Sequence, residues 1–257
     1  TMQVNATVSN CRVGSFTDLF NGGGLIEYSD LGPISGQETT VNFPELARSI
    51  GYAQGTIRRC DIRGCVDGTF VSGGSLTFEE CWFHGHYKAA SDPGQGGSAS
   101  HCDSIQISKG TGIRITRCRI DTIPWEIGET FDQWDSGAWP LPASAYNQAG
   151  QPVGSQCIII KPVNTTNVID DVVIDGCRIA GYLNGNMILI QKNTAIPTNI
   201  TVTNCQIDPR GLNSSTGSLG RAILTVGSGV SNPTWTNNTL AVDYTINGNT
   251  YLAGSTI

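Results

Sequence analysis

The chain has 257 residues and a formal net charge of −6, and only 14% of its residues are charged, against about 25% in an average globular protein. Low charge combined with many Val, Ile and Leu residues excludes a disordered chain, and the acidic balance gives no electrostatic basis for binding nucleic acid or anionic lipid. The longest apolar stretches, such as Cys157–Ile160, are far shorter than the roughly 20 residues that span a bilayer, so we expect no membrane insertion.

A short pattern repeats along the chain: an apolar residue, two others, a cysteine, one more residue and a second apolar residue. Successive copies begin at Val8, Ile57, Phe78, Ile115, Ile174, Val202 and Trp235. They place Cys11, Cys60, Cys81, Cys118, Cys177, Cys205 and finally Asn238 in the cysteine position. Repetition of one supersecondary unit is the sequence signature of a stacked, solenoid-like protein.

The alternation of residues before each cysteine indicates strands. Ile113 and Ile115 alternate with polar residues, which is the two-residue period of a half-buried strand. One extra residue before Cys118 breaks this period, so the chain should bend there and continue in a new strand. A further strand precedes several copies, at 104–108, 157–161, 187–191 and 222–226.

One such unit cannot bury its own apolar face, whereas stacked units can. The sequence therefore predicts an all-β fold, a right-handed parallel β-helix of about seven coils that forms a single domain over residues 1–257. A β-sandwich is the alternative, but it would not place cysteine in one fixed position.

The nine cysteines raise the question of disulfides. Cysteines stacked about 4.8 Å apart lie within disulfide range, but a small buried thiol also packs as a core residue without a partner. We expect a reduced ladder that points inward from one corner and is made in a reducing cytoplasm, rather than a set of disulfides. No closely spaced ligand pattern indicates a metal site.

Three loop insertions interrupt the repeat, at 14–55, 84–102 and 121–153, and insertions in a solenoid usually carry its function. The second and third contain the expected substrate-binding residues His84, His86, Tyr87, Trp125, Glu126, Trp134 and Trp139. Exposed aromatic rings beside carboxylates and amides suit sugars, because a pyranose has an apolar face and hydroxyl edges. The alternative is that the tryptophans fix a loop against the wall of the solenoid.

The most specific string is His101-Cys-Asp103-Ser-Ile-Gln106, directly before a strand. With the repeat, it resembles the pectin-lyase-like β-helix proteins, which include secreted carbohydrate-active proteins and bacteriophage tailspikes. The resemblance covers most of residues 55–240 in architecture and repeat. The chain departs from the family by using Cys at an Asn-rich corner, and it lacks the paired-aspartate pattern of polygalacturonases and the arginine motif of pectate lyases. The resemblance implies a polysaccharide partner, a virion-tail or extracellular location, and a homotrimer as one possible assembly.

The alternation around this string predicts which side chains face outward. Ile105 and Ile107 should face inward, and Gln106 and Ser108 outward. If the chain bends after Asp103, His101 and Asp103 form a hydrogen-bonded pair at the rim. That pair would act as an acid/base cluster or contact a sugar through Gln106, or it would only satisfy loop amides.

Two further groups complete the expected chemistry. Lys161 should stack near Ser108, where a lyase would need a base. A hydrolase would instead need two carboxylates about 5 to 10 Å apart. Candidates for these are Asp103, Glu126, Asp132 and Asp135.

The apolar residues Ile159, Met187 and Leu189 occupy outward positions in this alternation. An exposed apolar strip on a sheet marks either cover by a loop or an interface. The 121–153 insertion would provide the first, and side-by-side β-helices in a trimer the second.

We therefore expect a glycan-recognising β-helix domain, a phage tailspike-type depolymerase or receptor-binding protein acting on bacterial surface polysaccharide. As an enzyme it would be a polysaccharide lyase or a glycoside hydrolase. The alternatives are a secreted bacterial enzyme of the same kinds and a non-catalytic structural or adhesive module. No cofactor is expected, and calcium stays open because no cluster of oxygen ligands indicates it.

Overall fold

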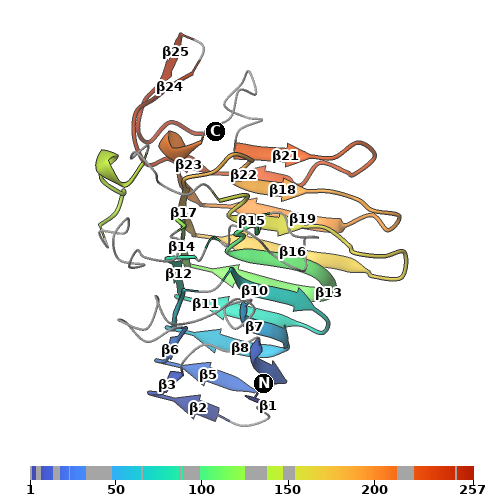
Figure 1. The fold of residues 1–257 in the computed structure, drawn as a ribbon. Coiled ribbons are helices and arrows are strands. Elements are labelled where there is room, and N and C mark those ends of the chain that lie inside the picture. Colours follow the sequence, from blue (N-terminus) through green and yellow to red (C-terminus); the bar gives the residue numbers. More distant parts are fainter. Residues whose placement is uncertain are drawn as a thin grey trace.

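The computed structural model describes residues 2–3, 7–13, 18–22, 24–32, 48–64, 66–86, 88, 99–124, 138–146, 154–212, 223–246 and 248–257. The regular structure of these residues is almost entirely β-strand, and the strands stack in long parallel sheets from the N-terminal to the C-terminal end (Figure 1). The chain is therefore an all-β solenoid.

The strands form three faces. The first face contains β1 (Met2–Gln3), β4 (Asp18–Gly22), β7 (Arg48–Ala53), β10 (Asp67–Ser72), the first part of β13 (Ile105–Thr116), β15 (Ile158–Ile160), β18 (Ile188–Ile190) and β21 (Leu224–Val226). The second contains β2 (Thr7–Ser9), β5 (Leu25–Glu27), β8 (Gly55–Arg58), β11 (Leu76–Glu79), the second part of β13, β16 (Ile169–Asp175), β19 (Thr198–Thr203) and β22 (Thr234–Thr236). The third contains β3 (Arg12–Val13), β6 (Asp30–Leu31), β9 (Asp61–Arg63), β12 (Trp82–His84), β14 (Arg119–Thr122), β17 (Arg178–Gly181), β20 (Gln206–Asp208) and β23 (Thr239–Leu240).

Each coil takes one strand from each face, and eight successive coils are present in the described residues. Strand pairing between coils is parallel throughout, and β13 joins the first and second faces in one unbroken strand. The antiparallel hairpin of β24 (Tyr244–Ile246) and β25 (Asn249–Tyr251) projects at the C-terminal end (Figure 1). The short 3-10 helices η2 (Ala143–Ala145) and η3 (Pro209–Gly211) lie outside the strands.

The bend between the second and third faces comes from a single residue in the left-handed backbone conformation. That residue directly precedes the cysteine position in every coil, with φ between 49° and 64°. The residues are Asn10, Tyr28, Arg59, Glu80, Arg117, Gly176, Asn204 and Asn237. This is the extra residue that breaks the strand alternation in the sequence, and its positive φ turns the chain before the next strand begins.

The cysteines line the inside of this bend. Cys60, Cys81, Cys118, Cys177 and Cys205 are buried, whereas Cys11 is exposed at the N-terminal end of the stack. All eight cysteines in the described part of the chain are free. At the C-terminal end Asn238 replaces the thiol, and its side chain accepts a hydrogen bond from the Cys205 backbone N–H (2.9 Å) and donates one to the Val202 carbonyl (3.0 Å).

The segment 14–55, expected as a loop insertion, contains a coil of its own. Its strands β5 and β6 pair with the coils before and after them. Ser29 stands in the cysteine position there, where its hydroxyl accepts a hydrogen bond from the Cys11 N–H (3.2 Å) and donates one to the Glu27 carbonyl (2.8 Å). The cysteine pattern missed this coil because serine fills the position, so the expected number of seven coils is too low.

The predicted exposed apolar strip is absent. Ile159 and Leu189 are only 9% and 8% exposed, and Met187 is fully buried in the main core. Met187 precedes β18 rather than lying within it, so the alternation of the strand does not apply to it.

Ser108 was also expected to face outward, and it is buried. The pairing of β10 with β13 shifts by one residue between Val71 and Ser72, so that Ser72 pairs with Lys109. The shift turns Ser108 inward, where its hydroxyl donates to the Val71 carbonyl (3.0 Å). A bulge of this kind cannot be read from alternation alone.

Candidate functional site

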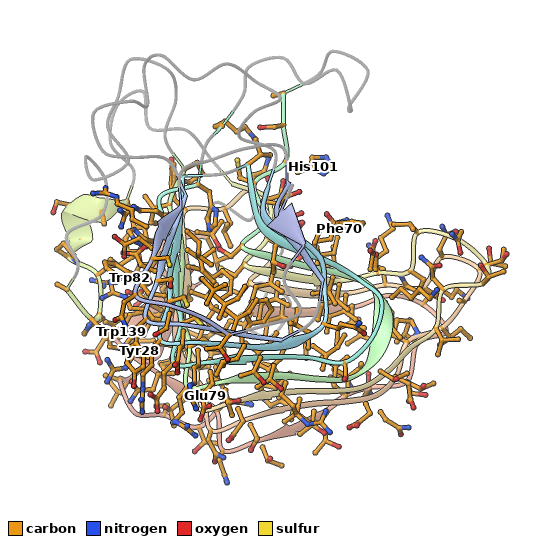
Figure 2. All side chains as sticks on the ribbon, turned by 90° about the horizontal axis from the view of Figure 1, so that it is seen from below. Tyr28, Phe70, Glu79, Trp82, His101 and Trp139 are labelled. Atoms are coloured by element: carbon orange, nitrogen blue, oxygen red, sulfur yellow. The ribbon has the colours of Figure 1, made fainter. Side chains whose placement is uncertain are left out.

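A cavity of about 290 Å³ lies on the outer side of the first face. It is lined by Val66, Asp67, His101, Asp103, Gln106, Ile159, Lys161, Val163 and Asn193. Figure 2, a view along the stack of coils, shows His101 and Phe70 on this side of the molecule. The cavity therefore brings together four residues that the sequence singled out, His101, Asp103, Gln106 and Lys161.

The strand register places two aspartates side by side. Thr69 of β10 pairs with Ile105 of β13, so Asp67 and Asp103, each two residues earlier, occupy the same position in adjacent coils. The Asp67 carboxylate accepts a hydrogen bond from the Asp103 backbone N–H (3.2 Å). Between them the coils approach so closely that a Cβ on Gly68 would lie 2.5 Å from the Ser104 carbonyl oxygen. The fold thus builds a pair of neighbouring carboxyl groups.

Asp103 is held in an environment that favours its protonated form. Asp103 is buried, and only 2% of the residue is exposed. Burial raises the pKa of Asp103 well above its usual range, and the negative charge of Asp67 raises it further. A hydrogen bond from the Gln156 N–H to Asp103 Oδ1 (2.9 Å) and the charge of Lys88 act in the opposite direction but do not outweigh burial. The pair therefore suits a division of roles between one proton donor and one carboxylate.

His101 does not form the predicted pair with Asp103. His101 is exposed at the cavity, and no hydrogen bond joins the two side chains in the described structure. Asp103 instead accepts from the Gln156 backbone, one coil further on. His101 keeps access to solvent and to any ligand in the cavity.

Lys161 and Gln106 lie where the sequence places them. Gln106 pairs with Ile159 in the next coil, and both face the cavity from the outer side of the sheet. The Lys161 backbone N–H donates to the Ile107 carbonyl (2.9 Å), which fixes Lys161 directly after β15. Lys161 thereby enters the same cavity as the carboxyl pair.

Three other predicted residues lie apart from this cavity. His84 is buried, and its Nε2 lies 2.8 Å from Asp61 Oδ1. Its ring stacks on that of Trp82, with 3.8 Å between the ring centroids. His86 is buried with Nε2 2.7 Å from the Ser104 hydroxyl. Because both rings are buried and hydrogen-bonded to protein side chains, neither is placed to bind a substrate in this cavity as we expected.

Trp139 lies on the side of the third face, with Trp82 and Tyr28 and away from His101 (Figure 2). The Arg119 guanidinium lies over the rings of both Trp82 (4.7 Å) and Trp139 (5.8 Å). Trp139 Nε1 also donates to Gln206 Oε1 (3.3 Å). These contacts fix residues 138–146 to the wall, which is the alternative role considered for the tryptophans.

The remaining predicted site residues lie outside the described residues. They are Tyr87, Trp125, Glu126, Asp132, Trp134 and Asp135.

Asp67 lines the candidate site but was not among the residues expected there from the sequence. The sequence contains a spacing that points to Asp67: it precedes the repeat cysteine Cys81 by 14 residues, and Asp103 precedes Cys118 by 15. The offset of one residue corresponds to the register shift at Val71 and Ser72. Aligning the coils on their cysteines, with one residue of tolerance, would have paired the two aspartates.

Within the described residues no helix is long and apolar enough to cross a membrane, and no group of three His, Cys, Asp or Glu side chains is arranged to hold a metal ion. No protein-family model, curated protein or solved structure matches the chain.

Proposed function

We propose that the chain is a right-handed parallel β-helix that binds and hydrolyses a polysaccharide, as a tailspike-type depolymerase of bacterial surface glycan. The proposal rests chiefly on the carboxyl pair Asp67 and Asp103 in a cavity on the outer wall. Right-handed winding is supported by the strong preference of parallel crossovers for that hand. An extended wall of parallel strands also suits a long polymer, because the ligand can lie across several coils.

The pair provides the two groups that glycoside hydrolysis needs. Protonated Asp103 gives its proton to the glycosidic oxygen as the bond from that oxygen to the anomeric carbon breaks. The Asp67 carboxylate stabilises the positive charge that develops on the sugar and takes a proton from the water that adds to the anomeric carbon. Gln106 and His101 lie in the same cavity and supply hydrogen bonds to the sugar hydroxyls.

Lys161 supports a second candidate reaction, a lyase reaction on a uronate-containing glycan. Lys161 lines the same cavity, and in a lyase it would be the base that removes the proton next to a uronate carboxyl group while the glycosidic bond at the next carbon breaks. Lyase products carry a carbon–carbon double bond that absorbs ultraviolet light, whereas hydrolase products do not. Product absorbance therefore separates the two reactions.

The test is a panel of capsular and lipopolysaccharide glycans, assayed for binding, new reducing ends and unsaturated products. For a cleaved glycan, we expect Asp103→Asn and Asp67→Asn each to lower the rate by about 10²- to 10⁴-fold. Asp175→Asn is the matched control, because Asp175 lies on the second face in β16. Its rate should equal that of the unaltered chain.

Three outcomes would count against this assignment. If a glycan is cleaved and both variants keep full activity, the carboxyl pair is not the catalytic site. If glycans are bound but none is cleaved, the domain is a receptor-binding protein. Absence of any binding would exclude glycan recognition altogether.

A further inference from the structure

A second cavity, of about 460 Å³, adjoins the first along the same face. It is lined by Lys161, Gln191, Lys192, Asn193, Gly227 and Ser228, and it shares Lys161 and Asn193 with the first cavity. A ligand that leaves the carboxyl pair toward the C-terminal coils therefore enters this second cavity.

The lining comes from the same turn in three consecutive coils. Lys161 follows β15, Gln191 follows β18 and Gly227 follows β21. Each of these residues donates its backbone N–H to a strand of the preceding coil, at 2.9, 2.9 and 2.8 Å. The side chains are therefore carried on a regular hydrogen-bonded ladder, which holds neighbouring coils about 4.8 Å apart.

The lysines of this cavity differ from seven arginines elsewhere in the described chain. Seven arginines lie in ion pairs with Asp or Glu, namely Arg58, Arg59, Arg63, Arg114, Arg117, Arg119 and Arg210. In the described structure Lys161 and Lys192 form no ion pair, and no carboxylate lines the second cavity. Two lysines without an ion-pair partner thus lie in one hollow of a chain whose net charge is −6.

The other polar groups of the cavity complete a site for an anion. The Gln191 amide and the Ser228 hydroxyl offer hydrogen-bond donors beside the two ammonium groups. The Asn193 amide donates to the Val163 carbonyl (3.0 Å) and has a second N–H to offer. A Cβ on Gly229 would lie 2.5 Å from Lys192 Nζ, so the ammonium lies directly against this turn. A carboxylate, sulfate or phosphate group matches these donors through charge-assisted hydrogen bonds.

We propose that the second cavity binds an acidic substituent of the glycan, on a sugar unit next to the one held by Asp67 and Asp103. The ligand is then an anionic polysaccharide, and Lys192 selects it over neutral glycans. This inference rests on the proposed function in taking a glycan as the ligand, but it does not depend on cleavage.

The test measures binding in the full chain carrying Asp103→Asn, so that the glycan stays intact. The probes are an acidic glycan from the panel that the chain binds, and the same glycan after carboxyl reduction, desulfation or dephosphorylation. These three treatments also identify which acidic group is recognised. We expect Lys192→Ala to weaken binding of the acidic form about tenfold and to leave the neutralised form unaffected.

Lys109→Ala is the matched control, because Lys109 is an exposed lysine of β13 that lines neither cavity. It removes the same charge and should leave the affinity unchanged. The inference would be overturned if Lys192→Ala lost no affinity for the acidic glycan, or if Lys109→Ala lost as much affinity as Lys192→Ala. It would also be overturned if the chain bound only neutral glycans. Loss of cleavage in Asp103→Asn is a separate readout, so failure of the anion site and failure of the catalytic pair are distinguishable.

Discussion

Asp103 is a carboxyl group that the fold holds away from water and beside a second carboxyl group. Both features raise its pKa, and together they make its ionisation unfavourable in the native state. A group arranged in this way lowers stability at neutral pH, because the unfolded chain loses the proton more readily. Such a cost is common where a side chain is held for chemistry rather than for stability.

This cost predicts a pH-dependent effect of Asp103→Asn on stability. The unfolded aspartate has a pKa of about 3.9, and the native pKa lies well above it. Below about pH 4 both states are protonated, and the variant should match the unaltered chain. As the pH rises toward the native pKa, the unaltered chain should lose about 1.4 kcal/mol per pH unit relative to the variant.

Urea unfolding of both proteins at pH 4 and pH 7 measures this difference in unfolding free energy. Contributions from groups that titrate alike in both proteins cancel in the comparison. An asparagine at this position still accepts the hydrogen bond from the Gln156 N–H. A difference in unfolding free energy that does not change with pH would show that Asp103 is ionised in the native state.

At the scale of residues, the sequence predicted part of the site. His101, Asp103, Gln106 and Lys161 do line one cavity, because strand alternation and stacking place them on one side. The direct contact of His101 with Asp103 was not predicted correctly, since the hydrogen bond of Asp103 goes to the backbone of the next coil. Bonds between coils depend on register, which a local string does not contain.

At the scale of elements, the bend before each cysteine controls how the strands of the second and third faces connect. The left-handed conformation raises the energy of most residue types by about 1–2 kcal/mol, whereas glycine adopts it without this cost and asparagine at a lower one. The position nevertheless carries Tyr28, Arg59, Glu80 and Arg117 in four of the coils. Tertiary stacking therefore imposes the bend even where local preference opposes it.

Gly176 allows this strain to be measured directly. Its φ is +64°, and a Cβ added there would meet its nearest neighbour, Arg117 Cγ, at an ordinary 3.5 Å. We therefore expect Gly176→Ala to lower the unfolding free energy by about 1 kcal/mol through backbone conformation alone. Gly176→Asn should cost clearly less.

Urea unfolding of the two variants at one pH provides the comparison. Equal costs for alanine and asparagine would mean that side-chain contacts, rather than the left-handed conformation, set the effect. The strand alternation predicted that a bend lies here, but the sequence could not show its backbone conformation, since arginine and glutamate are not typical of it.

At the scale of the whole molecule, the cysteine pattern predicted a stacked fold because it marks one fixed point in most coils. It failed at Ser29, which fills the same position with a hydroxyl that hydrogen-bonds as part of the ladder. The position after each bend therefore requires a small side chain that can hydrogen-bond with the backbone, and Cys, Ser and Asn all meet that requirement. A search for this wider set would have counted every described coil.

The same ladder predicts how the molecule opens. Each coil contacts only its neighbours, so a solenoid behaves as a nearly one-dimensional stack that frays from its ends. Cys11 is exposed at one end, whereas Cys81 and Cys118 lie in the two central coils and are buried.

Under native conditions we therefore expect iodoacetamide to label Cys11 first, Cys205 next, Cys60 and Cys177 later, and Cys81 and Cys118 last, as followed by mass spectrometry of the peptides. If the buried thiols instead react at one common rate, the coils open together, and the stack is a single cooperative unit rather than a chain of separable repeats.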